Sequence, residues 1–199
     1  MIEMKIINLT AHSRIYTGNV YLVLGNHNAL DDVNTLIDVG RDPEAISKLE
    51  QESTGVGKKR VDQVIITHEH YDHAGLLAEI KREYQPRVYA YNKSEYVDHA
   101  VREGKKIRVG DCECEIIHTP GHTYDSICIY CEAEGLLFSG DTSLDVITPG
   151  CYEEYYIRTL EKLRKRVIRI VYPGHGKPIT KRVEKMIRNS LKNVTMKAA

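Results

Sequence analysis

Three histidines and an aspartate fall within six consecutive residues of this chain, His68-Glu69-His70-Tyr71-Asp72-His73. The apolar run 61–67 before it predicts a strand, so the cluster lies on a loop at the carboxyl end of that strand. Imidazole and carboxylate groups are common ligands of divalent metal ions. Alternate residues of an extended loop point the same way, so the first two histidines suit one ion, and the aspartate and third histidine suit a second.

Four more histidine or aspartate residues directly follow apolar segments, each beside a glycine or a glycine-containing turn. They are Asp38, His122, Asp141 and His175. A fold that brings these strand ends together builds one cleft lined by histidines and aspartates.

Strands are predicted in two groups along the chain, with helices between and after them. The strands are expected at 5–9, 19–24, 34–37, 61–67, 88–90, 107–109, 112–118, 126–130, 136–139 and 168–172. The helices are expected at 43–52, 74–84, 94–101, 153–166 and 180–194. One layer of helices cannot cover so many strands, so we expect two packed sheets flanked by helices, four layers in all.

The predicted helix at 153–166 is expected to bury one stripe, formed by Tyr156, Leu160, Leu163 and Val167. No repeat or flexible linker divides the chain, so residues 1–199 are expected to form one domain.

The composition limits the class of protein. Lys plus Arg and Asp plus Glu are both 28, and this zero net charge disfavours a generally basic nucleic-acid binder. No apolar run is long enough for a membrane span, and the first ten residues do not form a signal peptide. Five cysteines, an odd number, fit the reducing cytoplasm better than a disulfide framework.

Five segments resemble, in their order, the motifs of the metallo-β-lactamase superfamily of hydrolases. They are TLIDVG (35–40), THEHYDHAG (67–75), TPGHT (119–123), SGDT (139–142) and PGHG (173–176). The resemblance implies a four-layer αββα sandwich of two mixed sheets, with the site at one edge of the sheets.

The resemblance also implies a role for each residue of the cluster. It implies that one metal ion is held by His68, His70 and His122. A second would be held by Asp72, His73 and His175, and Asp141 would bridge both. Asp38 resembles the carboxylate that orients the ligand set from outside it.

The complete ligand set resembles the glyoxalase II branch and implies two divalent metal ions, with zinc expected and iron or manganese as alternatives. A hydroxide bridging the metals would attack a small-molecule thioester or ester, and Asp72 would take or relay a proton. Tyr152, in the loop after SGDT, is the candidate substrate-binding residue.

Several alternatives stay open at this stage. The same metals serve lactonases and phosphodiesterases, related folds oxidise persulfides with one iron, and a non-catalytic metal-binding or sulfur-trafficking module is a further class. The branch that cuts nucleic acids carries a cap domain between the fourth and fifth motifs, and residues 142–174 are too few for one. Glyoxalase II carries further helices at its C-terminus, whereas only residues 176–199 follow His175 here, which leaves open whether glutathione thioesters are substrates. A homodimer is also open.

Overall fold

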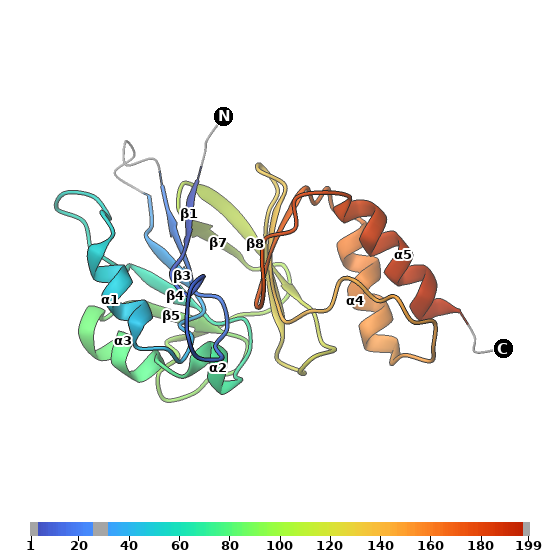
Figure 1. Cartoon of the computed structure of the whole chain (residues 1–199), viewed down its shortest axis with the longest axis horizontal. Helices are drawn as coiled ribbons and strands as arrows, with labels where there is room; N and C mark the ends of the chain where they lie inside the picture. Colours follow the sequence, from blue (N-terminus) through green and yellow to red (C-terminus); the bar gives the residue numbers. More distant parts are fainter. Residues whose placement is uncertain (1–3, 26–31, 197–199) are drawn as a thin grey trace.

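Two β-sheets lie face to face in the computed structural model, which describes residues 4–25 and 32–196 (Figure 1). The first sheet has the order β1-β2-β3-β4-β5-β6, and the second has the order β11-β10-β9-β8-β7. The first comprises β1 (Lys5–Asn8), β2 (Tyr21–Leu24), β3 (Thr35–Ile37), β4 (Gln63–Ile65), β5 (Arg87–Ala90) and β6 (His99–Ala100). The second comprises β7 (Lys106–Val109), β8 (Cys112–His118), β9 (Ile127–Cys131), β10 (Leu136–Gly140) and β11 (Ile170–Pro173).

Both sheets are mixed. In the first, β1, β2 and β3 are antiparallel neighbours, whereas β3, β4, β5 and β6 run parallel. In the second, only β10 and β11 are parallel, and the other neighbours are antiparallel. Both β9 and β10 are buried at every position, because one face of each strand meets the other sheet and the opposite face meets helices.

Helices cover the outer faces of both sheets (Figure 1). The first sheet is covered by α1 (Glu44–Gln51) and α3 (Leu77–Tyr84), with α2 (Tyr71–Ala74) just before α3; the second is covered by α4 (Glu154–Arg164) and α5 (Val183–Thr195). Leu49 and Ile80 pack onto the first sheet, and Leu160 and Ile187 onto the second. A third apolar core lies between the sheets. The prediction of four layers is therefore confirmed.

The helix predicted at 94–101 is wrong, because this segment forms turns and then the edge strand β6. Asp98 holds it beside β5: its backbone N–H donates to Val88 O at 3.0 Å, and its carboxylate accepts from Val88 N–H at 2.8 Å. The Asp98 carboxylate also pairs with Lys81. These contacts with β5 and with α3 override the local helix pattern.

The other four predicted helices form, with ends that differ from the prediction. The helix predicted at 74–84 begins three residues later, at Leu77, because Ala74 is the last residue of the separate short helix α2. The stripe predicted for α4 holds for its first three members, but Val167 is 56% exposed. The reason is that α4 ends at Arg164, so Val167 is no longer carried round to the buried face.

The loops after five strands meet at one edge of the sandwich. Strands β3, β4, β8, β10 and β11 lead into the segments that carry the predicted site residues. Among the residues that the structure describes, no helix combines the length and apolar character that crossing a membrane requires.

Candidate metal centre

Seven side chains from these loops form three groups of donor atoms, and within each group the atoms lie within 4.8 Å of one another. The groups are His68, His70 and His122; His68, His73 and Asp141; and Asp72, His73 and His175. The structure thus brings together all the residues for which the sequence predicted metal binding.

Asp141, at the end of β10, lies between the groups. Its Oδ1 is 3.3 Å from His73 Nε2, and its Oδ2 is 3.5 Å from His122 Nε2 and 3.4 Å from His175 Nε2. Burial by itself would raise the pKa of Asp141, but the hydrogen bond and charge of His73 and the charges of the other histidines lower it to about 2. A carboxylate with this pKa stays ionised and can face more than one cation.

Asp38 fixes the orientation of His73. His73 Nδ1 donates to Asp38 Oδ2 at 2.8 Å, so Nε2 is left facing the site. Thr67 donates to the same carboxylate through its backbone N–H at 2.7 Å and its hydroxyl at 2.8 Å. The φ of Asp38 is 59°, a left-handed conformation that is uncommon for a residue other than glycine. These three hydrogen bonds hold it there.

His68 provides the test of whether metal ions fit this site. Its Nδ1 lies 3.1 Å from the Thr67 hydroxyl, whereas its buried Nε2 has no hydrogen-bond partner among the described residues. Burial lowers the pKa of His68 to about 4, so the ring is neutral, which is the form that binds metals. A buried polar atom without a partner is costly, and a metal ion would supply the partner. The set of nitrogen and oxygen donors suits zinc, iron or manganese.

His70 and His122 approach each other at the exposed mouth of the site. His70 Nδ1 lies 3.0 Å from His122 Nε2. Two nitrogen ligands of one tetrahedral zinc ion lie about 3.3 Å apart. The separation of these two nitrogen atoms is therefore close to the separation that binding of one shared ion requires.

Tyr16 is a site residue that the sequence did not indicate. Its hydroxyl lies 3.4 Å from His175 Nε2, and its ring stacks on the His175 ring with centroids 5.1 Å apart. Tyr16 precedes β2 and belongs to none of the five motifs, so no spacing pattern could have identified it. Its exposed ring places a phenol beside the metal-binding atoms.

Asn19 and Tyr21 hold the loop that carries His175, and the sequence did not indicate this role either. Asn19 Nδ2 donates to Pro173 O at 2.8 Å and to Gly176 O at 2.9 Å, and the Tyr21 hydroxyl donates to Pro173 O at 2.8 Å. Gly174 in this loop has no room for a side chain, since a Cβ there would lie 2.2 Å from Asp141 Oδ1.

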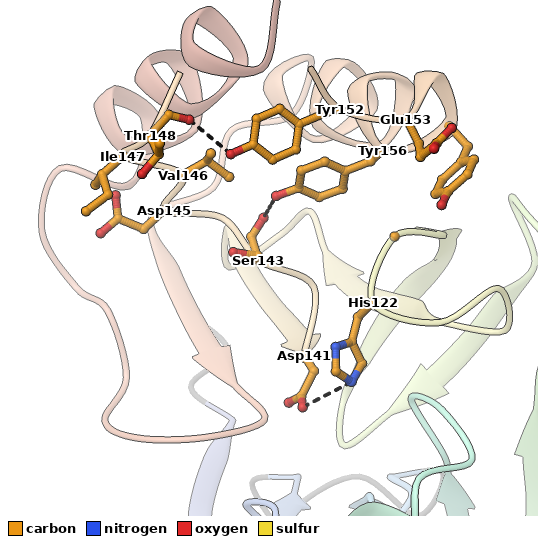
Figure 2. Close-up of a pocket in the computed structure, with 12 residues that line it drawn as sticks. His122, Asp141, Ser143, Asp145, Val146, Ile147, Thr148, Tyr152, Glu153 and Tyr156 are labelled. Carbon is orange, nitrogen blue, oxygen red and sulfur yellow. Dashed lines mark hydrogen bonds and ion pairs between the residues drawn. The ribbon is translucent and has the colours of Figure 1, made fainter. Parts of the chain in front are cut away.

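A pocket of about 470 Å³ opens beside His122 and Asp141 (Figure 2). Tyr152 lines it, but its hydroxyl donates to Thr148 O at 3.0 Å rather than pointing at the metal-binding atoms. Its role as a substrate-binding residue stays a prediction.

An αββα sandwich with a histidine and carboxylate site at its edge is the arrangement found in a known superfamily. The model of the metallo-beta-lactamase superfamily matches residues 14–105 and 97–175. The chain therefore belongs to the metallo-β-lactamase superfamily. A metallo-beta-lactamase family protein from Thermus thermophilus has the same fold, with a TM-score of 0.69 and 20% identity over 95% of this chain and 78% of that one.

Curated relatives are similar at modest identity. A hydroxyacylglutathione hydrolase from Rhodopseudomonas palustris is 33% identical over 149 residues, 73% of this chain and 55% of the relative. An atrochrysone carboxyl ACP thioesterase from Aspergillus fumigatus is 30% identical over 157 residues, 76% of this chain and 50% of the relative. The chain thus spans about half the length of these relatives.

The metal-free protein should release a proton when it binds divalent metal at neutral pH. Burial by itself would lower the pKa of His73, but Asp38 and Asp141 raise it to about 10, so the ring is charged at neutral pH and must lose its proton to bind a metal. We expect release of about one proton or more per chain, measured by calorimetry in buffers of different ionisation enthalpy.

The same shift fixes the sign of the stability change. The folded pKa of His73 lies above its ordinary value of 6.5, so its protonation stabilises the metal-free fold fully below pH 6.5. This stability is lost as the pH rises through about 10.

If the calorimetry shows that metal binds at neutral pH without release of a proton, the assignment of a charged His73 in the metal-free protein is contradicted.

Proposed function

We propose that this protein is a hydrolase of small thioesters or esters that uses two divalent metal ions, zinc in the first instance. One ion would be held by His68, His70 and His122, the other by Asp72, His73 and His175, with Asp141 shared between them. The observation that carries the proposal is that the Asp141 carboxylate lies within 4.0 Å of histidines from all three donor groups, with the buried Nε2 of His68 unpartnered among the described residues. The relatives named as a hydrolase and a thioesterase support the choice of substrate.

Metal ions in such a site lower the pKa of a bound water and polarise the bond that is attacked. The chain itself supplies the remaining functions. Asp72 Oδ2 lies 3.2 Å from His175 Nε2 and is the atom we expect to take a proton. Asp38 keeps His73 in one tautomer and one orientation. The phenol of Tyr16 stands where it can donate to an oxygen of the substrate.

The proposal is tested by metal analysis together with a substrate screen. Protein purified without added metal is expected to contain two equivalents of zinc, and His70→Ala and His175→Ala are each expected to lose about one. His99→Ala is the matched control, because His99 lies on β6 outside all three donor groups. Thioesters, esters, lactones and phosphodiesters are then compared as substrates.

The outcomes separate the alternatives. Two metal ions together with fastest turnover of thioesters or esters support the proposal. Two metal ions with faster turnover of lactones or phosphodiesters would support the two-metal site but contradict the proposed substrate class. One equivalent of iron that His175→Ala leaves unchanged would overturn the two-metal site and favour oxidation of persulfides.

The expected cytoplasmic location and the possible homodimer remain predictions. All five cysteines are free in the structure.

A further inference from the structure

The pocket beside the candidate metal centre has a wall of aromatic rings and aliphatic side chains. Tyr152, Tyr155 and Tyr156, at and just before the start of α4, line it together with Val146 and Ile147 from the loop after β10 (Figure 2). The Tyr156 hydroxyl donates to Ser143 O at 2.5 Å and the Tyr152 hydroxyl to Thr148 O. Because both hydroxyls are bonded to the backbone, these two tyrosines contribute ring surface to the pocket.

The charged groups of this pocket have one sign. Apart from Asp141, its charged lining residues are Asp145 and Glu153, and no lysine or arginine lines it among the described residues. Both carboxyl groups are exposed, and neither forms an ion pair with any residue in the described part of the chain. The two lie on opposite sides of the pocket in Figure 2. A negatively charged group entering between them, on the side of the pocket away from the metal-binding atoms, would meet repulsion that no lining lysine or arginine among the described residues offsets.

The size of the pocket indicates what it holds. A volume of about 470 Å³ lies within the range of pockets that bind small organic molecules. Aromatic faces flanked by carboxylates suit an apolar group, and they also suit a cation, which is attracted by both. The pocket adjoins His122 and Asp141. A substrate whose thioester or ester bond lies at the candidate metal centre would therefore place one of the two groups flanking that bond in the pocket.

We propose that this pocket selects substrates by charge: it receives an apolar group that is uncharged or cationic and rejects one that carries a carboxylate. The inference rests on the proposed hydrolase function and narrows its substrate class. It disfavours glutathione thioesters, whose peptide carries two carboxylates, if that part of the substrate occupies the pocket. The selected group is either the acyl part or the thiol part of the substrate, and the experiment separates the two.

The test uses two series of thioesters that share the scissile bond. In the first, N-acetylcysteamine thioesters carry a phenylbutanoyl group whose para position bears hydrogen, carboxylate or trimethylammonium. In the second, acetyl thioesters of benzyl mercaptan carry the same substituents on the thiol side. In the series that fills the pocket, kcat/KM for the neutral and cationic members should exceed that of the anionic member by about tenfold.

Substitutions connect this preference to the two carboxylates. Asp145→Asn and Glu153→Gln should each reduce the ratio of neutral to anionic kcat/KM by about threefold, and Asp145→Lys should reduce it further. Glu161→Gln is the matched control, because Glu161 lies on α4, is exposed and does not line the pocket. It should leave the ratio unchanged.

Binding of uncleavable thioether analogues to the metal-loaded protein, measured by calorimetry, separates this inference from the proposed function. If no thioester is hydrolysed but the neutral thioether binds more tightly than the anionic one, the proposed function fails and the charge selection stands. Equal binding of neutral and anionic analogues, no binding of either, or a ratio that none of the three pocket variants changes overturns the inference.

Discussion

Replacing Asp141 by asparagine is expected to lower kcat/KM for thioester hydrolysis by at least about 1000-fold. Asp141 is the one side chain in the described structure whose carboxylate lies within 4.0 Å of four histidines, His68, His73, His122 and His175. An amide cannot balance the charge of two metal ions, so both ions should be bound more weakly. The protein should therefore lose metal as well as activity.

Metal content by elemental analysis and thioester hydrolysis are measured on the same preparations of Asp141→Asn. Glu161→Gln is the control, because Glu161 is an exposed residue of α4 that belongs to no donor group and does not line the pocket. A variant that keeps two metal ions and loses less than about tenfold in rate would show that Asp141 does not connect the two groups.

Replacing Asp38 by alanine should have the largest effect on stability, about 3 kcal/mol in the free energy of unfolding of the metal-free protein. The carboxylate is buried and accepts three hydrogen bonds, two from Thr67 and one from His73. Its removal leaves the charged His73 ring without its partner. Loss of the fixed tautomer should also weaken metal binding by about 10–100-fold.

Denaturant unfolding and metal titration of Asp38→Ala measure these two effects. Asp38→Asn separates them: with its oxygen at the position of Oδ1 the amide still accepts from the Thr67 backbone N–H, but it offers an N–H donor, rather than an acceptor, to His73. We expect Asp38→Asn to lose less free energy of unfolding than Asp38→Ala, and to bind metal as weakly as Asp38→Ala does. Equal metal affinity in both variants and the unchanged protein would contradict an orienting role for Asp38.

Much of the fold could be predicted from the sequence because the pattern of burial is local. Strand β8 buries Cys112 and Cys114 and exposes Glu113. This alternation is expected of a strand that has one face in the core and the other face towards solvent. The apolar runs at 126–130 and 136–139 predicted strands, and the corresponding β9 and β10 are buried at every position. The prediction failed at 94–101, where the Asp98 carboxylate accepts a hydrogen bond from Val88 N–H on β5. Helix propensity depends on neighbouring residues in the sequence and does not include such a contact between distant segments.

The candidate ligands were also predictable, since three histidines and an aspartate within six residues of a loop have no packing purpose, and the resemblance added His122, Asp141 and His175. The sequence by itself thus determined the layers, the ligand types and the edge of the sheets at which they meet. The tertiary structure alone decided that Tyr16 stacks on His175 and that the adjoining pocket is lined by carboxylates and, among the described residues, by no lysine or arginine. Tyr16 and His175 are 159 residues apart, and contacts over such separations depend on how loops pack, which no local spacing or periodicity records.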